Sequence, residues 1–432
     1  MLKIARIPAV MQPFFNQAAV FLSVPQMAHF SLLVLGLVLT AGRGNVSALS
    51  RLRTRGAHRT KVNEFLTRSN WDSATILQRV TLWLLERARR LPARKGELDT
   101  DILFLVIDET KQGKRGKKMA GRSKVYVPSQ KRYIKGTIVV EAVLVFRGIT
   151  LPWAAELYLP KKEATRLGIP FVSQIDLAVQ MIAALPDADG LRVFVLFDSF
   201  YACKAVVQAV RARKWDFISV AKSNRVVITP GPKPAGKNRT VATYMAQALR
   251  HGGSWVHLGK GRRKRSYRVA VKNAGLRGIR SVRFVFSTIV REGKQRLTVP
   301  KPLALITSAT ELNPKEVIRL YQYRWSIELF FAEVKQRLGW SQYQTRSLTG
   351  SRRHLHLVNL AHALLTHLRL TQGEGAQAAG RQITIAASSR MGLWALARQL
   401  VTCDLIRVIQ QYGVETLNLS VDADVEELMK AA

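Results

Sequence analysis

The chain has 432 residues, which is long enough for two or three domains with a sizeable buried core. Its hydrophobic content of 47% is ordinary for a globular protein and excludes wholesale disorder. Its charge is unusual, because 68 Lys and Arg against 28 Asp and Glu leave a net charge of +40. Such an excess repels itself unless a polyanion offsets it, and nucleic acid is the usual polyanion. Ribosomal and membrane-surface proteins share this bias, so charge alone leaves several classes open.

The cysteines and histidines argue against a zinc site. Cys203 and Cys403 are the only cysteines, and no C-x-x-C pair or paired Cys/His spacing occurs. Four histidines lie close together in the C-terminal part of the chain, at positions 354, 356, 362 and 367. Because no cysteine or carboxylate stands near them at ligand spacing, we interpret them as helix-surface or partly buried residues.

Residues 1–97 predict a helical and basic N-terminal region. The apolar run at 30–42 is shorter than the roughly 20 residues that a bilayer span needs, so we predict a buried helix in a cytoplasmic protein with no membrane partner. Asp72 precedes a long amphipathic segment with a basic last turn, as an N-cap would. Short helices with basic faces favour a DNA-binding region, and a solvated basic bundle is the alternative.

Residues 98–350 change in character and predict an α/β domain. Apolar strand-like runs rich in β-branched residues alternate with helical segments, in the order three strands, helix, strand, helix, strand. These segments are 101–108, 136–148, 149–159, 171–185, 191–198, 199–214 and 216–222. Runs that are apolar on both faces are typical of central strands covered by helices. Residues from about 224 to 300 are basic and loop-rich, and they predict a β-rich insertion.

One predicted helix carries an unusual set of polar groups. In residues 321–339, Tyr321 is followed at offsets of 3, 7 and 14 by Arg324, Glu328 and Lys335. An uninterrupted helix would place all four within roughly 60° of one another. Residues 351–432 then predict further helices and an acidic tail.

Three acids stand out by their positions. Asp108 and Asp198 each end an apolar strand, and Glu328 lies on the polar stripe of the helix. Carboxylates at the rim of a sheet, with a third supplied by a helix, can bind Mg²⁺ or Mn²⁺. Two such ions about 3.5–4 Å apart stabilise both oxygens of a phosphodiester displacement.

Each acid also has a structural alternative. An Asp at the end of a strand is commonly a turn residue or a helix N-cap. Glu328 could pair with Arg324 one turn earlier, which would leave Tyr321 and Lys335 unexplained. Of the neighbouring acids, Glu109 would point to the opposite side of its strand from Asp108.

The spacing Tyr321-x2-Arg324-x3-Glu328-x6-Lys335 resembles the Y-R-E-K signature of the IS4-like and IS701-like family of DDE transposases. Residues 103–121, LFLVIDETKQGKRGKKMAG, resemble the segment that carries the family's first aspartate. Residues 195–204, VLFDSFYACK, resemble the segment of the second. The resemblance runs from about Ile102 to Thr345 and implies an RNase H-like catalytic core. The family often has a second Asp where Glu109 stands.

The resemblance implies an enzyme that cuts double-stranded DNA at the terminal inverted repeats of an insertion sequence and joins the freed 3′-hydroxyl to target DNA. Asp108, Asp198 and Glu328 would hold two Mg²⁺ or Mn²⁺ ions per active site. Arg324 and Lys335 would grip phosphates. Tyr321 would add a hydroxyl donor. The resemblance also implies a homodimer on paired DNA ends, formed partly by the C-terminal helical region at 351–432.

Two further predictions concern DNA contacts outside this helix. The basic residues just after Asp108, among them Lys114 and Lys117, are predicted to follow the DNA backbone, and a solvated loop is the alternative. Trp255, in the insertion, is the candidate for stacking on a flipped base if DNA ends are processed through a hairpin, with a packed tryptophan as the alternative.

Other classes fit the sequence less well. A domesticated transposase that only binds DNA would not need three carboxylates placed for metal. Another RNase H-like nuclease would not be expected to carry the Tyr, Arg and Lys stripe or the long basic insertion.

Overall fold

The computed structural model describes residues 4, 6–40, 44–52, 58–92, 100–229, 239–259, 265–290, 302–378 and 390–412. The chain forms two compact units. Unit 1 is Met1–Leu98, Glu109–Val172 and Glu328–Ala432, and unit 2 is Asp99–Asp108 and Ser173–Ile327. This division does not follow the three regions predicted from the sequence, which stay predictions. The acidic tail and much of the basic loop sequence of the insertion lie outside the described residues.

Unit 2 is built on a mixed sheet with the strand order β1-β5-β6-β11-β10-β9-β7, and β8 pairs with β9. The first three strands are parallel, and the others pair antiparallel. The strands are β1 (Ile102–Gly113, which continues into unit 1 after Asp108), β5 (Arg192–Phe197), β6 (Asp216–Val220), β7 (Val227–Ile228), β8 (Ser254–Leu258), β9 (Arg265–Leu276), β10 (Ile279–Val290) and β11 (Leu303–Thr307).

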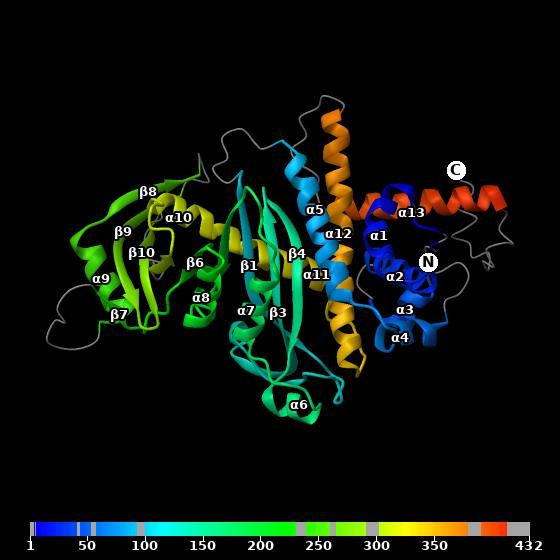
Figure 1. Cartoon of the computed structure of the whole chain (residues 1–432), viewed down its shortest axis with the longest axis horizontal. Coiled ribbons are helices and arrows are strands. Elements are labelled where there is room, and N and C mark those ends of the chain that lie inside the picture. The colour runs from blue at the N-terminus through cyan, green and yellow to red at the C-terminus, as the bar shows by residue number, and fades with distance from the viewer. Residues whose placement is uncertain are drawn as a thin grey trace. The chain divides into compact units, whose positions relative to one another are not determined.

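Helices complete unit 2 (Figure 1). They are α7 (Gln174–Ala184), α8 (Lys204–Ala212), α9 (Val241–His251), α10 (Pro314–Tyr321) and the short 3₁₀ helix η4 (Gln322–Arg324). The apolar runs of β1 and β5 are buried throughout, from Leu103 to Ile107 and from Val193 to Phe197. Since side chains alternate across a strand, burial on both faces identifies them as central strands.

Unit 1 combines an antiparallel sheet with helices. β3 (Arg132–Phe146) pairs with β2 (Ser123–Val127) and β4 (Ile149–Tyr158), and it also borders the end of β1. The helices are η1 (Ala9–Met11), α1 (Gln12–Ala19), α2 (Val24–Leu39), α3 (Val46–Ser50), α4 (Arg59–Thr67), α5 (Ser73–Arg90), η2 (Pro128–Gln130), α6 (Lys161–Arg166), α12 (Leu348–Ala378) and α13 (Arg390–Tyr412). Helix α11 (Trp325–Arg337) begins in unit 2 and continues into unit 1.

Helices α5 and α12 lie side by side against β4 (Figure 1). Polar groups of α12 reach the sheet inside this interface. Asn359 donates a hydrogen bond of 2.6 Å to Oε1 of the fully buried Glu141, and His356 donates one of 2.9 Å to the carbonyl oxygen of Ala155. Burial raises the pKa of Glu141 well above its ordinary value, the Asn359 hydrogen bond opposes this shift, and the charge of Glu156 adds to it.

The predicted buried helix at 30–42 is confirmed over residues 30–39 as the second half of α2, where every residue from Leu32 to Leu39 is buried, and residues 41 and 42 lie outside the described part of the chain. None of the described helices is long and apolar enough to cross a membrane. Asp72 caps α5 as predicted, because its carboxylate accepts hydrogen bonds from the backbone N–H groups of Ala74 and Thr75.

The predicted strands and helices of the α/β region are all present. The sequence patterns missed the short strands β2, β7 and β8 and the helices α6, α9 and α10. The prediction of one uninterrupted helix at 321–339 is wrong. The 3₁₀ turn η4 separates α10 from α11, so Tyr321 ends one helix and Glu328 lies in the first turn of the next.

Candidate active site

Asp108 and Asp198 follow the last register pair of two neighbouring parallel strands. Asp198 comes directly after β5, as predicted, whereas Asp108 lies inside β1, which continues to Gly113, so the prediction that Asp108 ends its strand is wrong. The register of β1 and β5 pairs Ile107 with Phe197, so the next residue on each strand is an aspartate. Neighbouring strands are about 4.8 Å apart, and residues at the same register position share a face of the sheet. The fold of unit 2 therefore brings two of the predicted acids together.

Both aspartates accept hydrogen bonds. Oδ1 of Asp198 accepts a hydrogen bond of 2.8 Å from the backbone N–H of Phe200, so the predicted turn role is real. Among the described residues, no hydrogen bond involves Oδ2 of Asp198, which is open to a further ligand. Oδ2 of Asp108 accepts a hydrogen bond of 3.1 Å from the Arg324 guanidinium.

The η4 turn is held against the strand ends by three side chains. Arg324 forms its ion pair with Asp108, with 19% and 16% of the two side chains exposed. The Tyr321 hydroxyl donates a hydrogen bond of 3.4 Å to the carbonyl oxygen of Phe197, directly before Asp198. The Tyr323 ring stacks on Phe104 of β1 at 4.5 Å between centroids. All three contacts are made at or next to the 3₁₀ turn that separates α10 from α11. No sequence pattern indicated the role of Tyr323.

Glu328 and Lys335 lie on α11, within unit 1. Glu328 is half-buried and follows Arg324 by one helical turn along the chain. The Lys335 ammonium lies 5.3 Å from the centre of the Phe331 ring, a cation–π contact within the helix. Glu333 is the other acid of α11, and His362 lies 3.2 Å from its carboxylate. Glu333 is thus part of the packing between α11 and α12.

Lys114 lies inside unit 1 and is not a surface cation. Its side chain donates a hydrogen bond of 2.8 Å to the carbonyl oxygen of Ser341, and its ammonium lies 3.2 Å from the centre of the Tyr343 ring. Only 6% of the residue is exposed, and this burial lowers its pKa to about 7. Lys117, three residues later, is exposed as predicted for a phosphate contact.

Trp255 is an exposed residue on β8. Its exposed fraction is 56%, so the alternative in which it packs beneath the sheet of the insertion is wrong. Its ring lies parallel to that of His257, with 6.5 Å between centroids. Stacking on a DNA base stays a prediction.

The aspartate pair suits a hard divalent cation. Carboxylate oxygens are the ligands that Mg²⁺ and Mn²⁺ prefer, and one oxygen of Asp198 is open. Across the described residues, however, no three His, Cys, Asp or Glu side chains are gathered closely enough to hold a metal ion. The Arg324 guanidinium occupies one carboxylate oxygen of the pair, at Asp108.

The sequence matches the family described as DDE superfamily endonuclease over residues 19–272, and the chain belongs to this family. The matched residues include Asp108 and Asp198 and end before Glu328.

The chain is also similar to a curated protein of Microchaete diplosiphon, "Probable transposase for insertion sequence element IS701". The two are 26% identical over 168 residues, which is 38% of this chain and 41% of the relative. The chain thus spans less than half the length of this relative in the match. Together the two findings confirm the predicted DDE family and its RNase H-like α/β fold.

Proposed function

We propose that the chain is an insertion-sequence transposase that cuts double-stranded DNA at terminal inverted repeats and joins the freed 3′-hydroxyl to target DNA. The proposal rests mainly on the in-register pair of Asp108 and Asp198 in a DDE endonuclease. The net charge of +40 supports a polyanionic substrate.

In this proposal Asp108, Asp198 and Glu328 hold two Mg²⁺ or Mn²⁺ ions. When bound, such ions activate the attacking oxygen and stabilise the leaving oxygen of a phosphodiester. Arg324 and Lys335 hold phosphates through charge-assisted hydrogen bonds, and Tyr321 orients a phosphate oxygen with its hydroxyl. Arg324 would release Asp108 when it takes up this role. Joining two DNA ends requires two active sites, so we propose a homodimer on paired ends.

Cleavage of a duplex that carries the element's own terminal repeat tests the proposal. Asp108→Asn, Asp198→Asn and Glu328→Gln should each abolish cutting in Mg²⁺ and retain most DNA binding, since the basic surface carries the binding. Glu333→Gln is the matched control, because it changes an acid of the same helix that contacts His362. A Glu328→Gln variant that cuts as well as the wild type would show that Glu328 has no part in the site.

The ion pair of Arg324 with Asp108 favours a second candidate, a DNA-binding protein that no longer cuts. If this pair is permanent, Asp108 cannot take up a metal ion. Tight binding to the terminal repeat by the wild type, with no cutting in Mg²⁺ or Mn²⁺, would select this candidate.

A further inference from the structure

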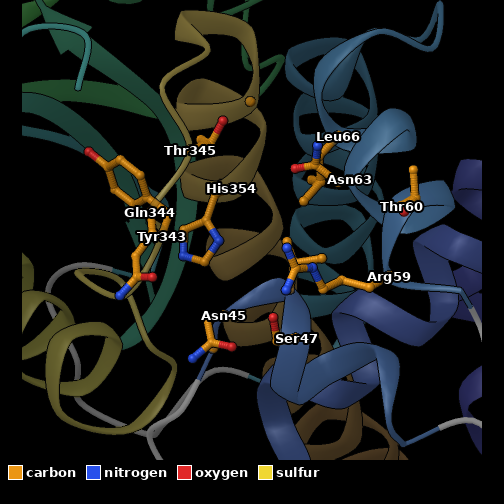
Figure 2. Close-up of a pocket in the computed structure, with 13 residues that line it drawn as sticks. Asn45, Ser47, Arg59, Thr60, Asn63, Leu66, Tyr343, Gln344, Thr345 and His354 are labelled. Carbon is orange, nitrogen blue, oxygen red and sulfur yellow. The ribbon is translucent and has the colours of Figure 1, made fainter. Parts of the chain in front are cut away.

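Unit 1 contains two cavities that share three lining residues. The first has a volume of about 360 Å³ and lies among α3, α4, the start of α12 and the segment before it (Figure 2). The second has a volume of about 980 Å³ and is lined by residues 113–119 and by the segment 341–346. Asn45, Tyr343 and Gln344 line both cavities. Residues Ser341–Arg346, which we call the 341–346 loop, thus border both spaces.

Hydrogen bonds and close backbone packing hold the 341–346 loop in place. Lys114 donates to the carbonyl oxygen of Ser341 at 2.8 Å, and the backbone N–H of Gly44 donates to Oε1 of Gln342 at 3.1 Å. Gly44 and Gly339 pack so closely that a Cβ at Gly339 would lie 2.9 Å from the Cα of Gly44. The loop therefore presents its remaining side chains from a fixed backbone, as a recognition element must.

The walls of the two cavities are basic. Exposed cations line them, namely Arg59, Arg115, Lys117, Lys118 and Arg346. No acidic residue is among the lining residues of either cavity. Within the described part of the chain, none of these five cations forms an ion pair. A cluster of uncompensated cations fits an anionic partner such as a phosphate backbone.

The smaller cavity adds groups that can recognise base edges. Figure 2 shows Asn63 and Arg59 of α4 on one side and Gln344 of the loop on the other. Between them lies His354, whose Nε2 donates to the carbonyl oxygen of Gly339 at 3.0 Å, so its Nδ1 is an acceptor. Burial lowers the pKa of His354 to about 4, which keeps this ring neutral at pH 7. Asn and Gln amides pair with adenine edges and Arg pairs with guanine.

We propose that the two cavities form one DNA site in which the larger cavity binds phosphates and Gln344, with Asn63, reads base edges. This inference rests on the proposed function and adds to it the element that chooses the DNA sequence. Cationic side chains of the larger cavity position the duplex, and amide side chains of the smaller one specify the sequence.

Binding without chemistry tests this inference separately from the proposed function. Affinities in EDTA are measured for a duplex from the end of the element and for a scrambled duplex of the same composition. Gln344→Ala should lower the preference for the element's end about tenfold or more and leave the scrambled duplex unaffected. Gln180→Ala, at an exposed position on α7, is the matched control and should change neither affinity.

Substitution of the cations that line the larger cavity should change the two binding affinities differently from Gln344→Ala. Lys117→Ala with Lys118→Ala should weaken binding to both duplexes equally and reduce the slope of log affinity against log salt by about two. The control is Lys161→Ala with Lys162→Ala on α6, which are also exposed. Unchanged preference in both Gln344→Ala and Asn63→Ala would overturn the inference, as would a wild type that does not prefer the element's end. Neither outcome contradicts the proposed function, which the cleavage assay tests separately.

Discussion

Replacing Arg324 by methionine should tighten metal binding in the absence of DNA. Methionine keeps much of the length of the side chain and removes the guanidinium that occupies Oδ2 of Asp108. If Asp108 is a metal ligand, a divalent ion in the wild type must displace this hydrogen bond. In the Arg324→Met variant this hydrogen bond is absent, so the metal ion has nothing to displace from Oδ2 of Asp108.

The size of the effect follows from the ion pair. A hydrogen bond between charged groups contributes about 1.5–3 kcal/mol. The Arg324 and Asp108 side chains are 19% and 16% exposed, so solvent screening reduces this to about 1–2 kcal/mol. A metal ion relieved of that competition should bind about 5–30-fold more tightly.

Titration with Mn²⁺, followed by the electron paramagnetic resonance signal of the free ion, measures this affinity without any cleavage. Lys315→Met removes an exposed positive charge from α10 and should leave the affinity unchanged. Asp108→Asn should weaken binding. Equal affinities for the wild type, Arg324→Met and Asp108→Asn would refute both the competition and the assignment of Asp108 as a ligand.

Four other changes test separate parts of the structure. Lys114→Ala should lower the free energy of unfolding by about 2–3 kcal/mol, because it truncates a buried side chain that supports the 341–346 loop, whereas Lys117→Ala should leave thermal melting unchanged. Glu141→Gln should raise the melting temperature above about pH 4.5 by an amount that grows with pH, because burial holds the pKa of this carboxyl well above 4.5 in the folded chain. The gain should vanish near pH 4. His354→Gln should make the free energy of unfolding fall less than in the wild type between pH 7 and pH 5. In the wild type, a buried histidine with a pKa of about 4, against 6.5 when unfolded, lowers this free energy by about 2 kcal/mol over that range. Trp255→Ala should change stability by less than about 0.5 kcal/mol and impair hairpin resolution, and unchanged hairpin products would remove Trp255 from the site.

The central strands could be predicted from the sequence because the pattern of apolar residues in them depends on burial alone. The runs that became β1 and β5 are apolar at every position, and each ends at the first polar residue, Asp108 or Asp198. A parallel pair of such runs must place those aspartates at one edge. Two of the short strands were missed because β7 has only two residues and β8 has only one buried residue, Val256, and so shows no apolar run.

Lys114 shows why a charged residue could not be placed from its neighbours in sequence. It stands in the basic run at 114–118, and four of these five residues are exposed as a solvated or DNA-binding loop predicts. Lys114 differs because Ser341 and Tyr343, more than 220 residues later, supply a carbonyl oxygen and an aromatic face. Only the tertiary fold brings these groups to it, and together they offset part of the cost of burying an amine.

The turn between α10 and α11 could not be predicted from the helical spacing of the sequence. The spacing of Tyr321, Arg324 and Glu328 is that of one helical face, and an uninterrupted helix satisfies it equally well. At the interruption, three side chains of a single turn contact other strands: Tyr321 contacts Phe197, Tyr323 contacts Phe104 and Arg324 contacts Asp108. A 3₁₀ turn winds tighter than an α-helix, so the helical periodicity is not continuous from α10 to α11. Any change that loosens Tyr323 from Phe104 should therefore alter how Tyr321 and Arg324 lie beside Phe197 and Asp108, without touching an acid.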